Sequence, residues 1–396
     1  MGIYLLKPGE LTLKGGNRKV FEGVLKRNLT RVLHTAQARV EMTRGRFFVH
    51  CREENCAAVE ESLGRLFGIA GWAKTRKCEK NPGDVISACV EEGKALAASG
   101  CKTFKIEARR TDKSFPLDSY ALRVRGGEAV SREVSELAVN VRNPDGVIDV
   151  EIREKAYIYG NARRGLGGLP VGTAGRGLLL LSGGIDSPVA GFMMAGRGMG
   201  IDAVYFHAWP YTSAEAREKV IRLAEIVGSY CLGIKLHIAN FTGVQMRIKE
   251  IAPLSWTTVL LRMAMMDCAE RIARKTGCKC LITGESLSQV ASQTIENLSC
   301  TQSKVEMPVL RPLIGIDKDG IIRRAEKIGT YEISILPYQD CCVLFSPPHP
   351  VLRGDAGEAA RLYESLKPED IIEEVLGESE IVKCGFPPEI KINGNL

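Results

Sequence analysis

A glycine-rich turn stands between an apolar run and a proline in the stretch LLLLSGGIDSPVAG, residues 178–191. Gly183 and Gly184 suit a tight turn that exposes backbone N–H groups. Ser187 can cap a helix, and Pro188 fits its first turn. A strand, a glycine turn and a helix N-terminus in this order are typical of a phosphate-binding site. We therefore expect this stretch to hold phosphate.

The turn differs from two common nucleotide-binding motifs. A Walker A loop needs a lysine after its last glycine, and a Rossmann turn needs Gly-x-Gly-x-x-Gly. Residues 182–187, SGGIDS, match neither. They resemble the PP-loop of the ATP pyrophosphatases, which cleave ATP between its α- and β-phosphates. In such a loop the glycines and Ser187 would hold pyrophosphate, and Asp186 would help to hold Mg²⁺. A plain glycine turn with a surface aspartate is the structural alternative.

Four further stretches narrow the resemblance. FHAWPYTS, residues 206–213, and RPLIGIDKDGIIRRAEKIGTYEISILPYQDCC, residues 311–342, resemble signatures of the 4-thiouridine synthetases, also called tRNA sulfurtransferases. KPGELTLKGGNR, residues 7–18, resembles their ferredoxin-like opening, and TFKIEARRTDKSFPLDS, residues 103–119, resembles their RNA-binding THUMP domain. The resemblance covers nearly the whole chain in the family's domain order.

This resemblance implies a two-step reaction on tRNA. ATP would adenylate uridine 8 at its exocyclic oxygen O4, and a persulfide sulfur would then displace AMP and leave 4-thiouridine. The sulfur would come from a cysteine desulfurase. The same persulfide would also serve thiamine thiazole synthesis, as it does in several members.

The resemblance also assigns residues to the reaction, position by position. It implies that Asp186 helps to hold Mg²⁺, that Lys318 neutralises charge on the α-phosphate, and that Cys341 is the catalytic cysteine of sulfur transfer. ATP and Mg²⁺ are therefore the expected cofactors. The expected nucleotide-binding positions are Leu180, Leu181, Ser182, Gly183, Gly184, Asp186, Ser187, Tyr205, Phe206, Arg262, Gly284 and Gln293.

Several of these positions also have a purely structural explanation. Tyr205 and Phe206 end an expected strand, where packing alone would account for them. Arg262 lies within an apolar helix and needs a partner, which a phosphate or an acidic side chain would supply. Lys318 belongs to the charged sequence DKD, residues 317–319, which is typical of a helix N-terminus.

Cysteine usage bears on the sulfur carrier. The sequence holds 13 cysteines, and an odd number without a secretory signal favours a reducing compartment. A structural pair is the alternative interpretation of Cys341 and its neighbour. Some family members carry the persulfide on a C-terminal rhodanese domain, but this sequence ends at Leu396, so we expect that domain to be lacking. Other candidates for the carrier, or for the partner of Cys341, are Cys342, Cys300, Cys280 and Cys268.

Charge is distributed unevenly along the chain. Residues 1–176 hold 31 Lys and Arg against 21 Asp and Glu, whereas residues 177–396 hold 23 against 26. A basic first half favours binding to a polyanion, and tRNA is the partner that the resemblance implies. A solvated surface is the alternative. The candidate RNA-binding residues are Lys14, Arg18, Lys19, Arg109, Arg110 and Lys113.

The elements that position these residues follow from patterning. After residue 177, strands and helices alternate, which predicts a doubly wound parallel sheet whose ligands bind near the switch point. The expected fold class is α/β. We expect a ferredoxin-like α+β domain over residues 1–60, a THUMP domain over 61–165, a linker over 166–176 and a PP-loop domain over 177–396.

Local signals place individual elements. Helices are expected near 84–98 and 129–140, and Thr212 with Glu215 has capping-box spacing before the next helical pattern. No apolar run of about 18 residues appears, so we expect no membrane span and no membrane partner. The cysteine usage is the reason for which we expect a cytoplasmic protein. Dimerisation would extend an RNA-binding surface, which leaves a homodimer open.

Three other functions remain open from the sequence. The first is another PP-loop enzyme that adenylates its substrate and delivers nitrogen, for which Cys341 would be dispensable. The second is an RNA-binding module with a degenerate ATP site, which the intact SGGIDS argues against. The third is a sulfur donor for thiazole synthesis alone, which would not need the basic half.

Overall fold

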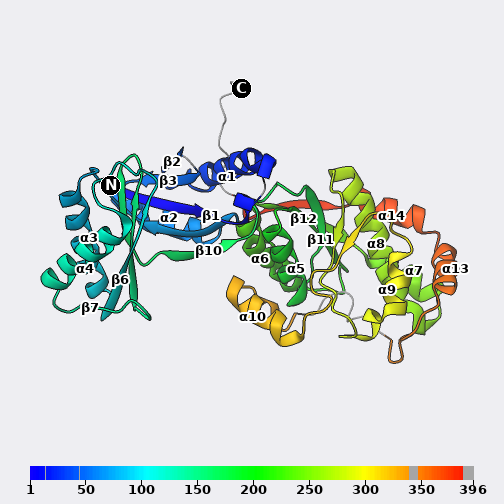
Figure 1. Ribbon diagram of the computed structural model, residues 1–396. Coiled ribbons are helices and arrows are strands. Elements are labelled where there is room, and N and C mark those ends of the chain that lie inside the picture. Colours follow the sequence, from blue (N-terminus) through cyan, green and yellow to red (C-terminus); the bar gives the residue numbers. More distant parts are fainter. Residues whose placement is uncertain (14, 44, 339–346, 387–396) are drawn as a thin grey trace, which may run out of the picture. The chain divides into compact units, whose positions relative to one another are not determined.

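The computed structural model describes residues 1–13, 15–43, 45–338 and 347–386. The chain divides into two compact units, Met1–Leu169 and Pro170–Leu396, called here the N-terminal and C-terminal units (Figure 1). The division falls within residues 166–176, the glycine-rich segment expected to be a linker. Among the described residues, no helix is both long and apolar enough to cross a membrane.

The first sheet of the N-terminal unit is antiparallel and has five strands. Helices α1 (Arg18–Val32) and α2 (Cys56–Gly64) accompany it. Residue 60, the expected end of the first domain, falls within α2. The strands are, in spatial order, β10 (Arg163–Gly167), β4 (Ile69–Lys74), β1 (Gly2–Pro8), β3 (Arg46–Cys51) and β2 (Arg39–Thr43).

The second sheet packs against helices α3 (Pro82–Ala98) and α4 (Ser119–Glu133). The prediction of a helix near 129–140 is wrong, since α4 begins ten residues earlier. Asp118 caps α4 by accepting a hydrogen bond from Ala121 N at 2.7 Å. The strands are, in spatial order, β5 (Arg76–Cys78), β9 (Ala156–Gly160), β8 (Gly146–Ile152), β6 (Thr103–Arg110) and β7 (Ala138–Val139).

A buried carboxylate joins the two sheets of the N-terminal unit. Glu151 on β8 accepts hydrogen bonds from Tyr159 Oη at 3.0 Å and from Arg153 Nε at 2.8 Å, and it lies 3.4 Å from Arg46 Nε on β3. Burial opposes ionisation, but the two guanidinium groups outweigh it and hold the pKa of Glu151 below its ordinary value. Phe48 packs on Tyr157 beside this contact, with ring centroids 4.6 Å apart. The two sheets therefore meet in a small buried cluster of their own, which contains Leu5, Phe48, Ala73, Tyr157 and Tyr159.

The C-terminal unit is built on a six-stranded sheet. Five strands run parallel, and the last strand along the chain pairs antiparallel at one edge. The chain winds outward from β11 through β12 and β13, then returns to the other side of β11. The strands are, in spatial order, β15 (Val309–Leu310), β14 (Leu281–Ile282), β11 (Arg176–Leu180), β12 (Gly200–His207), β13 (Ile234–Asn240) and β16 (Glu380–Cys384). The predicted doubly wound sheet is confirmed, and its switch point lies between β11 and β14.

Helices lie on both faces of this sheet (Figure 1). Leu178 and Leu179 on β11 point to opposite faces: Leu178 joins the core formed with α8, and Leu179 packs against Gly191 of α5. The helices on the α5 face are α5 (Asp186–Gly196), α6 (Ala214–Cys231), α10 (Lys318–Ile328) and α11 (Tyr331–Ser334). Those on the α8 face are α7 (Thr242–Ile251), α8 (Thr257–Thr276), α9 (Ile295–Gln302), α13 (Ala356–Ser365) and α14 (Pro368–Gly377).

The predicted capping box before α6 is wrong. Ser213 is the N-cap residue, and its Oγ accepts from Ala216 N at 3.3 Å. Thr212 is buried instead: its Oγ1 accepts from Ala208 N at 3.0 Å and lies 2.7 Å from His207 Nδ1. The threonine therefore braces the chain at the carboxyl end of β12, and the neighbouring serine begins the helix.

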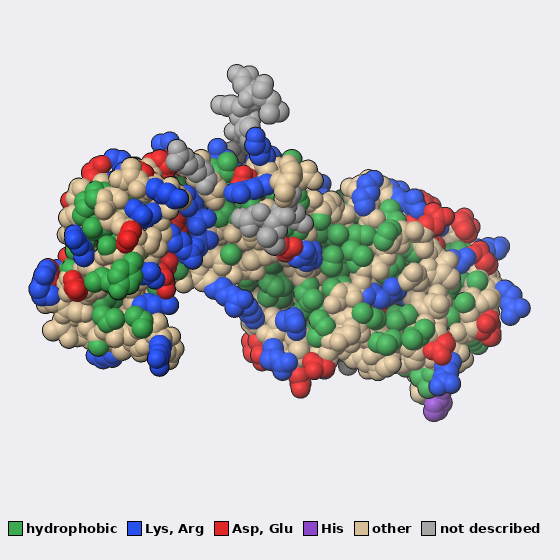
Figure 2. Space-filling model, viewed as in Figure 1, with side chains coloured by type: hydrophobic (Ala, Val, Ile, Leu, Met, Phe, Trp, Pro, Cys, Tyr) green, Lys and Arg blue, Asp and Glu red, His purple; other side chains and the backbone are tan. Residues whose placement is uncertain are grey.

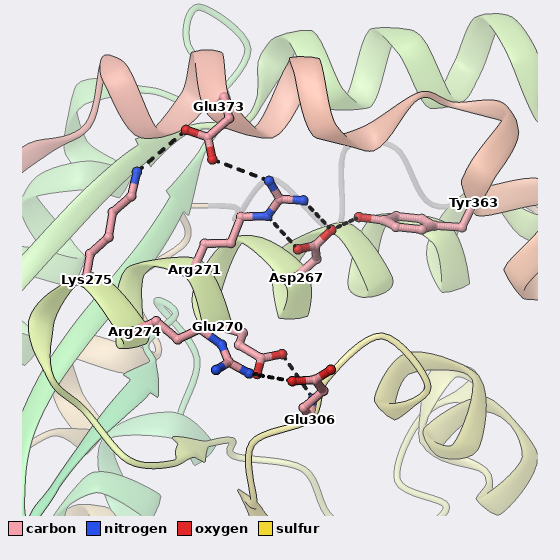
Figure 3. A network of polar contacts seen from close by, with 8 residues as sticks. All are labelled: Asp267, Glu270, Arg271, Arg274, Lys275, Glu306, Tyr363 and Glu373. Carbon is pink, nitrogen blue, oxygen red and sulfur yellow. Dashed lines mark hydrogen bonds and ion pairs between the residues drawn. The ribbon is translucent and has the colours of Figure 1, made fainter.

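A polar network fixes α13 and α14 to the long helix α8 (Figure 3). Asp267 accepts from Arg271 Nε at 2.8 Å and from the buried Tyr363 Oη at 2.9 Å. Glu373 on α14 lies 3.3 Å from Arg271 Nη1 and 3.6 Å from Lys275 Nζ. The Tyr363 hydroxyl is the buried part of this network, whereas Glu373 is exposed.

Removing the buried hydroxyl should cost more than removing the exposed charge. In Tyr363→Phe, Asp267 loses a buried donor, so we expect the free energy of unfolding to fall by about 1–2 kcal/mol. In the control Glu373→Gln, only exposed ion pairs weaken, so we expect a change within about 0.5 kcal/mol. Urea unfolding of both variants measures the difference. An equal loss of unfolding free energy in the two variants would contradict the assignment of the Tyr363 hydroxyl as the buried part of the network.

Candidate active site

A cavity of about 190 Å³ opens at the switch point of the C-terminal sheet. Its wall comes from the carboxyl ends of β11, β12 and β14 and from α8. The residues predicted to bind a nucleotide that line it are Leu180, Leu181, Ser182, Gly184, Asp186, Ser187, Tyr205, Phe206, Arg262, Gly284 and Gln293. Gly183 belongs to the same loop but is not part of the wall. The structure therefore brings together residues spread over more than one hundred positions of sequence.

The loop after β11 is closed by its own serines. Ser182 N donates to Ser187 Oγ at 2.9 Å, and Gly184 N donates to Ser182 Oγ at 3.3 Å. The expected N-cap role of Ser187 is wrong, because α5 begins at Asp186 and Ser187 lies in its first turn. The loop and the first turn of α5 place backbone N–H groups beside the cavity, which suits an anion.

Gly284 lies where the chain after β14 passes the start of α5. A Cβ at this position would stand 2.6 Å from Ser187 N and 2.8 Å from Ser187 Cα. Both of those atoms are backbone, so they could not move aside without displacing the loop. The resemblance implied a nucleotide contact for Gly284, and the structure adds a reason of its own: only glycine permits this approach.

Asp186 and Lys318, predicted to act together on the phosphates, are ion-paired. Lys318 Nζ donates to Asp186 Oδ1 at 2.6 Å, and Gln289 Nε2 donates to Asp186 Oδ2 at 2.9 Å. Lys318 is also the first residue of α10, which Asp317 caps through Gly320 N at 2.6 Å. The structural interpretation of Lys318 as part of a charged helix N-terminus is therefore confirmed, and its role at the α-phosphate stays a prediction.

The donors present fit Mg²⁺ only as an ion that arrives with the nucleotide. Within the described part of the chain, no group of three or more His, Cys, Asp or Glu side chains could hold a metal. Mg²⁺ is commonly bound through one or two carboxylates together with substrate phosphates. Asp186, at the mouth of the phosphate loop, offers one such carboxylate.

A buried carboxylate that was not predicted from the sequence lies at the floor of the cavity. Glu285 is 4% exposed, forms an ion pair with Arg262, and accepts from Arg311 Nε at 2.7 Å and from Thr283 Oγ1 at 2.9 Å. Burial raises its pKa, but the two guanidinium groups and these hydrogen bonds outweigh burial and hold the pKa below its ordinary value. Glu285 is thus the acidic partner that Arg262 needs.

Among the polar atoms at the cavity, one acceptor and one donor are left without a hydrogen bond in the described structure. They are the Oε1 acceptor of Gln293, a residue only 7% exposed, and the Nε donor of Arg262. Buried polar groups are normally paired. A ligand in the cavity would meet one acceptor and one donor.

Apolar side chains complete the wall. Tyr205 and Phe206 are buried, and Phe206 also packs on Phe241 with ring centroids 4.5 Å apart. Met265 and Met266 on α8 line the cavity as well and were not predicted. The rule that ligands bind at the carboxyl ends of parallel strands would have pointed to Thr283 and Glu285, but no comparable signal marks the methionines.

The cysteines differ in what the structure says of them. Cys341 and Cys342 lie outside the described residues. The other three candidates, Cys268, Cys280 and Cys300, are buried, and burial raises the pKa of their thiols, to about 12 for Cys268 and about 11 for Cys280. A buried neutral thiol is a poor nucleophile, so these three are disfavoured as carriers.

Some of the candidate RNA-binding side chains are exposed, and others already form an ion pair or a hydrogen bond within the unit. Lys and Arg side chains are widespread on the face of the N-terminal unit in view in Figure 2. Lys19, Arg109 and Lys113 are exposed. Arg18 pairs with Glu22 at 2.7 Å, Arg110 Nη1 donates to Phe115 O at 3.0 Å, and Lys14 lies outside the described residues.

Comparison with known proteins decides the family. The descriptions that match are "ThiI ferredoxin-like domain" over residues 3–73, "THUMP domain" over 80–160 and "Thiamine biosynthesis protein (ThiI)" over 172–367. A probable tRNA sulfurtransferase of Treponema pallidum (strain Nichols) is 49% identical over 367 residues, 92% of this chain and 91% of that protein. This chain belongs to the ThiI family of tRNA sulfurtransferases.

Further members of the ThiI family agree along the whole chain. A probable tRNA sulfurtransferase of Thermoanaerobacter pseudethanolicus (strain ATCC 33223 / 39E) is 45% identical over 382 residues, 96% of this chain and 99% of that protein. The crystal structure of a 4-thiouridine synthetase in complex with RNA and bound ATP superposes with a TM-score of 0.90 at 36% identity, covering 97% of this chain and all of that one. The expected ferredoxin-like, THUMP and parallel-sheet architecture is confirmed.

A methyl group at position 284 tests the packing of the cavity. Overpacking costs about 1–3 kcal/mol, so we expect Gly284→Ala to raise the Kd for ATP by about tenfold or more. Gly315→Ala is the matched control, because a Cβ there meets no atom within 4 Å. Calorimetric titration with ATP measures both, and an unchanged Kd in Gly284→Ala would refute the close-approach argument.

Proposed function

We propose that this chain is an ATP-dependent tRNA uridine 4-sulfurtransferase that forms 4-thiouridine at uridine 8 of tRNA. The main observation in support of this proposal is the cavity at the switch point, where the phosphate loop meets the Asp186–Lys318 pair. Membership of the ThiI family supports the assignment, as does a solved relative named a 4-thiouridine synthetase with RNA and ATP bound. The family description supports a further role in donating sulfur for thiamine thiazole synthesis.

The first step in this proposal is adenylation. Uridine O4 attacks the α-phosphorus of ATP, the bond to the β-phosphate oxygen breaks, and pyrophosphate leaves. Backbone N–H groups in the first turn of α5 hold the departing phosphates, because Ser182 N and Gly184 N already donate to serine hydroxyls. Lys318 stabilises negative charge that develops on the α-phosphate. Asp186 would hold Mg²⁺, which would supply charge neutralisation to the phosphates when bound.

The second step delivers sulfur. The terminal sulfur of a persulfide attacks C4 of the activated uridine, and AMP leaves with the O4 oxygen. A thiolate then attacks the carrier sulfur of the resulting C4–S–S adduct, which releases 4-thiouridine and leaves a protein disulfide that an external thiol reduces. We assign the catalytic thiol to Cys341, with a cysteine desulfurase as the donor of persulfide. Support from the described residues comes from Ser334, whose Oγ donates to Gly184 O at 3.3 Å. The chain that leads to Cys341 therefore starts beside the phosphate loop.

The direct test is nucleoside analysis. Unmodified tRNA incubated with the protein, ATP, Mg²⁺ and a persulfide source should contain 4-thiouridine at position 8 by mass spectrometry. Cys341→Ser should lose this product while still releasing pyrophosphate. If Cys341→Ser still forms 4-thiouridine at the wild-type rate, the assignment of the catalytic thiol to Cys341 is wrong. If the wild-type protein releases pyrophosphate but adds nitrogen in place of sulfur, a nitrogen-delivering PP-loop enzyme becomes the better assignment. Absence of 4-thiouridine with the wild-type protein would refute the proposal.

Substitution of Asp186, the carboxylate of the phosphate loop, should abolish adenylation and leave tRNA binding intact. In Asp186→Ala the phosphates lose their carboxylate-anchored ion, so we expect pyrophosphate release to fall below detection. Binding of tRNA should remain within about twofold, since phosphate contacts to RNA come from basic side chains. Filter binding of labelled tRNA and a pyrophosphate assay measure the pair. A parallel loss of both activities would contradict this division of labour.

A further inference from the structure

A buried lysine on α6 holds the chain that follows α11. Lys219 is 5% exposed, and its Nζ donates to Leu336 O at 2.8 Å and lies 3.5 Å from Tyr338 O. Its neighbours on the same helix, Val220 and Leu223, are fully buried apolar side chains. A buried ammonium group is unfavourable unless hydrogen bonds replace its water. The backbone carbonyls of residues 336 and 338 supply such bonds.

The same stretch of chain has a second anchor, on the phosphate loop. Ser334 is the last residue of α11, and its hydroxyl donates to Gly184 O at 3.3 Å. Residues 334–338 are therefore fixed at two points, one on the loop that follows β11 and one on α6. The two anchors come from elements far apart in sequence, which share the α5 face of the sheet.

Covalent geometry connects these anchors with the sulfur-transfer step. Cys341 follows Tyr338 by three residues, and three residues of extended chain span at most about 11 Å. Cys341 itself lies outside the described residues, but the chain that leads to it departs from a point that Lys219 holds. We infer that Lys219 is a positioning residue for sulfur transfer, which acts by fixing residues 336–338 rather than by contacting ATP. The inference rests on the proposed function, in which Cys341 handles the sulfur.

The position of Lys219 predicts which step it serves. Asp186 and Lys318, assigned to adenylation, lie on α5 and α10, whereas Lys219 bonds the chain after α11. Loss of its ammonium group should leave the phosphate loop in place and allow residues 336–338 to shift. Because small misplacements of a reacting group are costly, sulfur transfer should suffer and adenylation should not.

The test separates the two steps in the full-length protein. We expect Lys219→Met, which keeps the length of the side chain and removes its charge, to release pyrophosphate in a single turnover at a rate within about twofold of wild type. We expect its rate of 4-thiouridine formation to fall by about tenfold or more. Lys219→Gln keeps an N–H donor for the Leu336 carbonyl and should recover part of that loss.

The control is Arg222→Met, which removes an exposed cation one turn further along α6 and should leave both rates unchanged. Thiolation by Lys219→Met at the rate of Arg222→Met would overturn the inference. An equal fall of pyrophosphate release and thiolation in both Lys219 variants would also overturn it, because that result indicates general damage to the unit. A wild-type protein that forms no 4-thiouridine would refute the proposed function instead, before any variant is compared.

Discussion

The close passage of Gly284 over the first turn of α5 is the constraint on which the cavity depends. Strands β11 and β14 are neighbours in the sheet, but the chain leaves them in opposite directions at the switch point. Because no Cβ stands at position 284, the chain after β14 reaches Ser187 N, and both loops form one wall. Glu285 follows directly and enters the floor of the same cavity. The order of strands creates the cavity at the switch point. The absence of a side chain at Gly284 determines how closely the chain after β14 approaches the loop after β11.

Charge in the cavity is arranged around one carboxylate. Two adjacent guanidinium groups repel each other and are costly to bury. Glu285 lies between Arg262 and Arg311 and compensates one of the two charges. Arg311 is not part of the cavity wall, whose charged side chains are Asp186, Arg262 and Glu285, so the N-terminus of α5 is the feature of the wall that favours an anion beside Arg262. The carboxylate therefore fixes both arginine side chains in place.

Much of this arrangement could be predicted from the sequence, and the failures have physical causes. The strand, glycine turn and helix around SGGIDS are local features, so residues 178–191 revealed the loop. The partners of Asp186 and Arg262 could not be derived in the same way, because Gln289 and Glu285 reach them only through the strand order. Capping was mispredicted for a different reason: Ser187 and Thr212 have the right side chains for N-caps, but each bonds a backbone N–H of the chain before its helix, Ser182 N and Ala208 N.

The Asp186–Lys318 pair explains how one loop can serve both an empty and a loaded site. The pair is partly exposed, with 42% of the Lys318 side chain accessible, and ion pairs of this kind contribute only about 0–1 kcal/mol. In the proposed function, Lys318 can therefore leave the carboxylate at little cost when nucleotide phosphates offer it a stronger partner. Gln289 keeps its own bond to the other carboxylate oxygen, so Asp186 stays oriented while its partner changes. The exposed Asp186–Lys318 pair at the mouth of the cavity can thus exchange partners. The buried Glu285, held by Arg262 and Arg311 at the floor, stays fixed.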